Sequence, residues 1–190
     1  MILFIDTETT GLPDFNKRAR DPSQPHIVTL GALLCDDEGG EIETHDLLVK
    51  PDGWTIPKEA SDVHGITDEL AALGIHEREV AKLVVDLFGK ADLIVGHNLQ
   101  FDKFMCRIAA RRYDVINDNH DQWWKNLACF CTMRATTNIC RLPGNFPGQF
   151  KWPKLSEAYF HAFGEHFDGA HSALADCRAA KRLFHWLNNR

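Results

Sequence analysis

The chain has 190 residues and a formal net charge of −6, with 44% hydrophobic and 25% charged residues. A chain of this length buries roughly two-thirds or more of its unfolded surface, so we expect a single domain over residues 1–190. No stretch approaches the ~20 apolar residues of a membrane span, and the start of the chain lacks the basic flank and long apolar run of a signal peptide. The sequence therefore predicts a soluble, cytoplasmic protein without a membrane partner.

Five short apolar runs predict β-strands. The second and third runs are separated by Asp36-Asp37-Glu38-Gly39-Gly40, a turn-rich segment that fits a hairpin. The first three strands are therefore expected to form an antiparallel meander. In chain order the predicted strands are Ile2–Ile5, Ile27–Cys35, Ile42–Val49, Leu93–Val95 and Leu127–Cys131.

Helical patterns lie between and after these runs, and the alternation predicts an α/β fold. Gly65 is placed to end one helix, and Thr67 is placed to cap the next. Residues 117–126 and 142–153 are expected to be loops. The predicted helices are Pro57–His64, Thr67–Leu73, Glu77–Gly89, Leu99–Arg112, Met133–Ile139, Leu155–Phe163 and Ser172–Leu187.

The first segment that carries chemistry is Asp6-Thr7-Glu8, directly after the first strand. Because side chains alternate with a period of two along an extended chain, Asp6 and Glu8 share one face. Close carboxylates repel each other unless a cation binds, so the pair predicts a metal site. The alternative is an acidic strand end and turn, since Asp-x-Glu alone often occurs by chance.

A further acid, Asp102, follows the fourth predicted strand in the segment His97-Asn98-Leu99-Gln100-Phe101-Asp102. Sites in α/β sheets favour the carboxyl ends of strands, and a helix N-terminus helps to keep a nearby carboxylate ionised. The alternative is an ordinary acid in the first turn of a helix.

The third segment contains His171 and Asp176. Five residues along a helix correspond to about 140° of rotation, so the two side chains would lie on different faces if both were helical. His171 is therefore expected to precede the last helix, with Ser172 as its N-cap and Asp176 in its first turns. The reference pKa of histidine, near 6.5, suits a base at neutral pH.

In this order, Asp-x-Glu, Asp and His-x4-Asp resemble the motifs of the DnaQ-like 3′–5′ exonucleases, in the histidine-bearing (DEDDh) branch, over about residues 2–187. The resemblance implies an RNase H-like three-layer α/β/α sandwich with a mixed, roughly five-stranded sheet. It implies hydrolysis from a 3′ end, assisted by two Mg²⁺ or Mn²⁺ ions about 3.5–4 Å apart, with release of nucleoside 5′-monophosphates. Asp6, Glu8, Asp102 and Asp176 would hold the metals, and His171 would take the proton from the attacking water.

Several residues near these motifs are candidates for substrate contact. The segment Thr9-Thr10-Gly11-Leu12 would present backbone N–H groups to a terminal hydroxyl, and Leu12 would wedge against a base. His64 lies in Val63-His64-Gly65-Ile66-Thr67, which resembles a segment near the bound nucleotide in polymerase-associated relatives; a helix-terminal histidine is the alternative. The remaining candidates, each with a helix-cap or core alternative, are His97, Asn98 and Phe101.

The negative net charge conceals a basic middle third. Residues 103–154 hold nine basic and three acidic side chains, a charge of +6, so the remaining residues carry −12. Aromatic residues are interleaved there, and cations with aromatic faces hold single strands without reading their sequence. The segment predicts a nucleic-acid surface, with a solvated helix face over core aromatics as the alternative.

DNA with a free 3′ end is the expected substrate, because the oligoribonuclease branch usually has methionine where this chain has Thr9. Three alternatives stay open: an exoribonuclease, a catalytically silent nucleic-acid-binding or polymerase-docking module, and an unrelated small-molecule enzyme. The last is disfavoured because the chain has no glycine-rich phosphate loop. The chain ends at Arg190 without a long tail, so we expect a free-standing exonuclease, with a polymerase or repair complex as a further possible partner. The sequence does not determine the oligomeric state.

Overall fold

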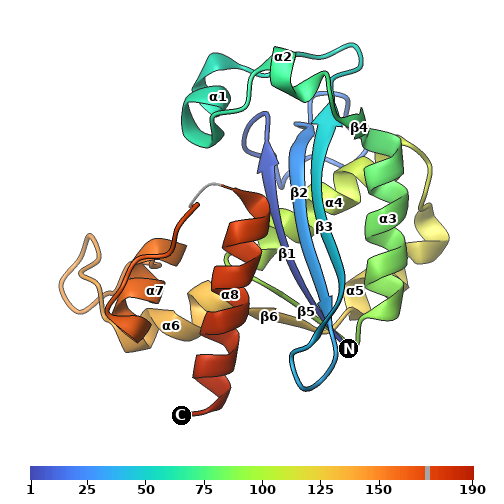
Figure 1. The fold of residues 1–190 in the computed structure, drawn as a ribbon. Coiled ribbons are helices and arrows are strands. Elements are labelled where there is room, and N and C mark those ends of the chain that lie inside the picture. The colour runs from blue at the N-terminus through green and yellow to red at the C-terminus, as the bar shows by residue number, and fades with distance from the viewer. Residues whose placement is uncertain (170–171) are drawn as a thin grey trace.

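A mixed six-stranded sheet runs through the centre of the computed structural model, which describes residues 1–169 and 172–190 (Figure 1). The strand order is β4-β3-β2-β1-β5-β6. The first three strands pair antiparallel, as predicted, and the others pair parallel with their neighbours. The strands are β1 (Ile2–Thr9), β2 (Ile27–Cys35), β3 (Glu41–Lys50), β4 (Ile75–His76), β5 (Leu93–Gly96) and β6 (Cys129–Cys131).

Helices cover both faces of the sheet, which confirms the predicted three-layer α/β/α architecture (Figure 1). Helices α3 (Glu77–Lys90) and α4 (Leu99–Arg112) pack on one face. The opposite face carries α8 (Ala173–Asn188), with α6 (Thr132–Cys140) and α7 (Leu155–Phe163) beside it. The short helices α1 (Lys58–His64) and α2 (Asp68–Ala71) lie over the ends of the central strands.

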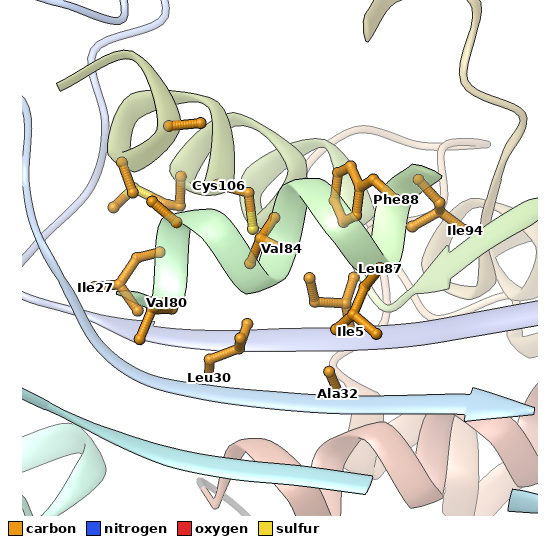
Figure 2. Packing of buried hydrophobic residues seen from close by; sticks show 14 of the residues in the cluster. Ile5, Ile27, Leu30, Ala32, Val80, Val84, Leu87, Phe88, Ile94 and Cys106 are labelled. Carbon is orange, nitrogen blue, oxygen red and sulfur yellow. The ribbon is translucent and has the colours of Figure 1, made fainter. Parts of the chain in front are cut away.

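The alternation of side chains along β1 assigns each residue to one of these layers. Leu3 and Ile5 enter the larger core with α3 and α4, and Figure 2 shows Ile5 facing this helical layer. Phe4 points the other way, where its ring lies 5.7 Å from that of Phe184 on α8. The same alternation continues into the polar half of the strand, so it also determines which helix each polar side chain meets.

Most predicted boundaries agree with the structure to within a few residues, and the helix end at Gly65 and the Thr67 cap are both present. The prediction of a loop over residues 117–126 is wrong. Asp118–His120 forms a 3₁₀ turn and Asp121–Asn126 forms helix α5. Contacts with α4 and α3 hold this segment: Arg111 pairs with Asp118 and Asp121, and Trp124 packs on Phe88 with ring centroids 5.2 Å apart. Residues 142–153 form a loop, as predicted.

Two further differences concern the sheet. Strand β1 continues to Thr9 instead of ending at Ile5, because its polar half keeps pairing with β2. The two-residue strand β4 is additional to the five strands expected, and it pairs with the end of β3. No helix in the described part of the chain is long and apolar enough to cross a membrane.

Candidate active site

Three carboxylates meet where β1 ends and α8 begins. Asp6 and Glu8 share the face of Phe4, which is the face that α8 covers, and Asp176 lies in the first turn of α8. One carboxylate oxygen from each of the three lies within 4.8 Å of the other two. The structure thus brings together three of the acids singled out in the sequence. His171 and its neighbour Ala170 lie outside the described residues.

The close approach of α8 to the sheet depends on Gly31, a residue that belongs to none of the predicted motifs. Gly31 of β2 pairs with Asp6 of β1. A Cβ atom at this position would lie 2.3 Å from the carbonyl carbon and oxygen of Ala173 and 2.5 Å from the nitrogen of Leu174. Only glycine lets the first turn of α8 sit this close to the strand, and that turn carries Asp176. Glycine inside a buried strand often marks such a close approach, which is the signal that would have found it.

Asp102 reaches the site from the opposite face of the sheet. It lies in the first turn of α4 and is 2% exposed. Thr7, which points away from α8, donates to Asp102 Oδ1 through both its backbone N–H (2.9 Å) and its hydroxyl (2.8 Å). These two bonds fix the Asp102 carboxylate beside the strand that carries Asp6.

The electrostatics of the site disfavour negative charge when no cation is bound. Burial raises the pKa of Asp6 well above its ordinary value, and the charges of Asp102, Asp176 and Glu8 raise it further. Burial, with a contribution from Asp176, raises the pKa of Glu8 to about 7. Burial also raises the pKa of Asp102 to about 7, against the opposing effect of the bonds from Thr7. Within the described part of the chain, the charged side chains that act on these three acids are all carboxylates.

This set of ligands fits a hard divalent cation. Among the described residues its donors are carboxylate oxygens, the type that Mg²⁺, Mn²⁺ and Ca²⁺ prefer, rather than the cysteine and imidazole ligands of structural zinc sites. A cation would also relieve the repulsion that raises these pKa values.

A cavity of about 430 Å³ adjoins Glu8, and five of the predicted substrate-contact residues line it: Thr9, Thr10, Leu12, His64 and Phe101. Leu12 is 86% exposed at the rim, so its apolar side chain faces solvent there. The volume is in the range of small-molecule binding sites.

The polar groups of this cavity are partly used within the protein. Thr10 donates its N–H to the His26 carbonyl (3.0 Å), and its hydroxyl accepts from the His26 N–H (2.9 Å). Contrary to the expectation, the Thr10 N–H is therefore already used within the protein. The Thr9 hydroxyl donates to the Gly11 carbonyl (2.8 Å) and shapes the turn. His64 Nδ1 accepts from the Ile66 N–H (3.1 Å), and burial lowers the pKa of His64, which keeps the ring neutral with its proton on Nε2.

His97 and Asn98 lie outside this cavity. Both nitrogens of the His97 ring have internal partners, the Thr132 hydroxyl (3.0 Å) and the Pro153 carbonyl (2.9 Å), so this side chain connects the turn between β5 and α4 to the start of α6 and to the segment before α7. Asn98 precedes α4 with φ 68°, and its side chain makes no capping hydrogen bond. Asn98 thus occupies the N-cap position, as the helix-cap alternative expected, but without the side-chain hydrogen bond of a typical cap.

Comparison with known proteins agrees with this fold and site. The family model described as Exonuclease (RNase_T) matches residues 3–184. The chain is 34% identical over 177 residues to an uncharacterized exonuclease, CP81, of Escherichia phage 186, covering 93% of this chain and 82% of that protein. It is 33% identical over 100 residues to the DNA polymerase III subunit epsilon of Haemophilus influenzae, covering 53% of this chain and 37% of the subunit.

The fold is also similar to that of E. coli exonuclease I in a crystal structure with a dT13 oligonucleotide, with a TM-score of 0.77 and 23% sequence identity. That match covers 100% of this chain and 41% of exonuclease I. The fold and the acidic site define an exonuclease domain. The chain belongs to the DnaQ-like 3′–5′ exonucleases of the RNase H-like superfamily, as its motifs predicted.

Proposed function

We propose that the protein removes nucleotides from the 3′ end of single-stranded or frayed DNA and releases nucleoside 5′-monophosphates. The observation that carries this proposal is the cluster of Asp6, Glu8 and Asp176 beside a cavity of about 430 Å³. DNA is favoured because one relative is named as a DNA polymerase III subunit and the structure of exonuclease I was solved with a dT oligonucleotide. A polymerase partner and a cytoplasmic location belong to the same proposal.

Asp6, Glu8 and Asp176 would hold a divalent cation, and Asp102 would support a second one directly or through water. Mg²⁺ and Mn²⁺ are the proposed cofactors, because they bind carboxylate oxygens and serve in phosphodiester hydrolysis. When bound, such ions lower the pKa of a water molecule and stabilise the charge that develops on the leaving oxygen.

The protein's own groups would position the reacting end. Thr7 fixes the Asp102 carboxylate, and Leu12 with Phe101 forms the apolar wall against which a terminal base would rest. His64 lines the same cavity, and its neutral ring adds no charge to the place where the terminal nucleotide would bind. We assign to His171 the role of general base, which accepts the proton of the attacking water. Its spacing to Asp176 and the reference pKa of histidine, near 6.5, support this role.

The proposal is tested by digesting a 5′-labelled single-stranded DNA with purified protein and Mg²⁺. A ladder of products shortened stepwise from the 3′ end, together with nucleoside 5′-monophosphates, is expected. Asp6→Asn protein controls for contaminating nuclease, and Asp14→Asn, which changes an exposed acid outside the cluster, controls for loss of charge. Early release of the labelled 5′ nucleotide would contradict the polarity.

An RNA strand of the same sequence, assayed in parallel, tests the exoribonuclease alternative. A higher kcat/KM for the RNA strand than for the DNA strand would show that RNA is the preferred substrate. The role of His171 has its own test: His171→Ala is expected to lower turnover strongly while cation binding, measured by calorimetry, persists. Near-normal turnover would exclude His171 as the base.

A further inference from the structure

Three neighbouring cavities form a continuous path that leads away from the acidic cluster. Leu12 and Phe101 line both the cavity beside Glu8 and a second one of about 380 Å³. Phe15 and Arg134 line both the second cavity and a third one of about 480 Å³. The path therefore begins where a terminal nucleotide would bind and continues along α4 toward β6.

The charged side chains of the third cavity are all basic, although the chain as a whole is acidic. They are Lys103, Arg107 and Arg134. Arg107 pairs with Asp121 (2.7 Å). The Lys103 ammonium lies 3.3 Å from the Cys129 sulfur, and Arg134 donates to the Gln100 amide oxygen (3.2 Å). Neither Lys103 nor Arg134 forms an ion pair with a described carboxylate, so two positive charges are available to an anionic ligand.

Large aromatic side chains are exposed along the same path. Phe15 is 51% exposed and stacks on Phe104, with ring centroids 4.8 Å apart and an interplanar angle of 22°. Trp152 is 64% exposed and lines the second cavity. Exposed aromatic groups that border a groove mark binding surfaces, since leaving them in water is unfavourable.

We propose that these residues, Phe15, Lys103, Phe104, Arg134 and Trp152, form an upstream track that binds the nucleotides on the 5′ side of the terminal nucleotide in a single strand. The proposal rests on the proposed exonuclease function. Unpaired bases stack on the aromatic faces, and the phosphates between them lie against Lys103 and Arg134. Stacking and charge read no base identity, so the track accepts any sequence.

The track has a consequence for substrate class. A ligand that consists of one nucleotide reaches only the first cavity, whereas a longer strand also occupies the second and third. The enzyme should therefore favour strands over the shortest oligonucleotides, which separates it from an oligoribonuclease-like activity.

The test compares two substrates that differ only in whether they reach the upstream track. One is thymidine 5′-(4-nitrophenyl phosphate), whose single nucleotide occupies the first cavity. The other is an oligothymidylate of roughly twelve nucleotides, within the about 4–16 nucleotides that single-strand-binding folds occupy. The variants are Phe15→Ala and the double variant Lys103→Ala/Arg134→Ala. Arg141→Ala, which removes an exposed charge at the end of α6 outside the three cavities, is the matched control.

For the oligothymidylate, Phe15→Ala is expected to raise KM by about tenfold, the size of one base stack. The double variant should raise KM and also reduce the dependence of affinity on salt, by about 0.7 in the log–log slope for each phosphate that the protein no longer neutralises. The kinetics with the nitrophenyl substrate should stay at the wild-type values for all variants. Equal changes in KM for both substrates, or wild-type KM for both variants, would overturn the track.

A second readout does not depend on turnover. Cys129 is exposed and lines the third cavity, so its alkylation by iodoacetamide, located by mass spectrometry, reports occupation of the track. In Asp6→Asn protein, the oligothymidylate should slow this alkylation, and thymidine 5′-monophosphate should not. Unchanged alkylation under saturating oligothymidylate would overturn the track even if the exonuclease activity is confirmed. Protection of Cys129 by a protein that hydrolyses neither substrate would support the track and contradict the proposed function.

Discussion

Glu77 and the acids of the active-site cluster are all shielded from solvent, but their pKa values are shifted in opposite directions. Glu77, at the start of α3, is 1% exposed and accepts hydrogen bonds from the Ile27 N–H (3.0 Å), the His26 ring (2.8 Å) and the Arg112 guanidinium (3.1 Å). Burial acts to raise the pKa of Glu77, but the His26 bond and the Arg112 charge outweigh it and lower the pKa. In the cluster of Asp6 and Glu8, burial and neighbouring carboxylates act in the same direction, and the pKa values rise.

The difference separates an acid that has a cationic partner within the chain from the acids that we propose to hold a metal. Glu77 finds its cation within the chain, so it ties β2 to α3 and α4 and needs no ligand. Within the described residues, the charged side chains that act on Asp6, Glu8 and Asp102 are carboxylates, and a cation from solution would offset their repulsion. Low exposure alone therefore does not identify a functional acid; the identity of its neighbours does.

The largest expected effect is the loss of activity on replacing Asp6. Asp6→Asn should lower kcat by about a thousandfold or more, because it removes a proposed metal ligand and a catalytic metal supplies several kcal/mol of transition-state stabilisation. Without divalent cations, the same variant should be at least as stable as the wild type, because one repelled charge is gone. Both are measured on the same preparation, by oligonucleotide digestion and by thermal unfolding in a chelator. Near-normal turnover would remove Asp6 from the proposed site.

Replacing Glu77 should lower the stability of the protein and leave its turnover unchanged. Glu77→Ala leaves Arg112 without its buried partner, so the free energy of unfolding should fall by about 3–5 kcal/mol. The turnover of the molecules that remain folded should not change, because Glu77 lies outside the cluster. Urea denaturation and active-site-normalised kinetics separate the two quantities. Glu77→Gln, which keeps the volume, should lose less; a selective fall in kcat would show that the two groups of acids are coupled.

The third effect tests how the cluster is assembled. Gly31→Ala places a methyl group against the backbone of Ala173, so it should cost about 1–3 kcal/mol of stability and weaken cation binding by moving Asp176. Gly89→Ala is the matched control: it lies within α3, its new Cβ would meet no atom within 4 Å, and it should stabilise by up to about 1 kcal/mol. Unchanged cation affinity in Gly31→Ala would show that α8 can move without disturbing the site.

Gly31 also illustrates what sequence reasoning finds and what it misses. The period of two along β1 was sufficient to place Asp6 and Glu8 on one face, because that rule is local. The helix bounds of α4 and α7 were predicted to the residue for the same reason. The importance of Gly31 depends on a helix about 140 residues later in the chain, and no local pattern contains that information.

The missed elements have the same origin. Helix α5 has polar residues typical of a loop and is held by Trp124 against Phe88, while β4 exists only through its pairing with β3. The predicted role of the Thr10 N–H was wrong because His26, 16 residues away, takes that donor. The roles assigned to the acids and to His171 remain predictions, and kinetics of the variants with defined substrates and cations are needed to test them.

The fourth effect is a dependence of stability on pH that should differ between the two groups of acids. A raised pKa means that the native metal-free protein holds protons that the unfolded chain has released, so stability is lost as the pH rises from the ordinary value of 4.5 for Glu8 toward about 7. Between about pH 5 and pH 8 in a chelator, Glu8 alone should contribute a loss of about 1–2 kcal/mol, allowing for solvent screening, and the raised pKa of Asp102 adds to it in the same direction.

Saturating Mg²⁺ should abolish this loss, since binding to the native state adds stability. Glu77 contributes in the reverse sense: its pKa is lowered, so its contribution is complete above its ordinary value of 4.5 and is lost as the pH falls below it. The measurement is thermal unfolding across the pH range with and without Mg²⁺. A metal-free protein whose stability is flat from about pH 5 to pH 8 would contradict the raised pKa values.

The smallest expected effect concerns the link between the two faces of the site. Thr7→Val removes one of the two hydrogen bonds to Asp102 and leaves the backbone N–H bond in place. Because these bonds oppose the effect of burial on the pKa of Asp102, the variant should hold its proton to higher pH and compete more with a cation. The Mg²⁺ concentration needed for half-maximal activity at neutral pH should rise by about tenfold, consistent with about 1.5 kcal/mol for a bond to a carboxylate. Thr7→Ser, which keeps the hydroxyl, should restore the wild-type requirement. If Thr7→Ser is as impaired as Thr7→Val, a hydroxyl at this position is not sufficient to restore the wild-type requirement, and the hydrogen bond is not what controls Asp102.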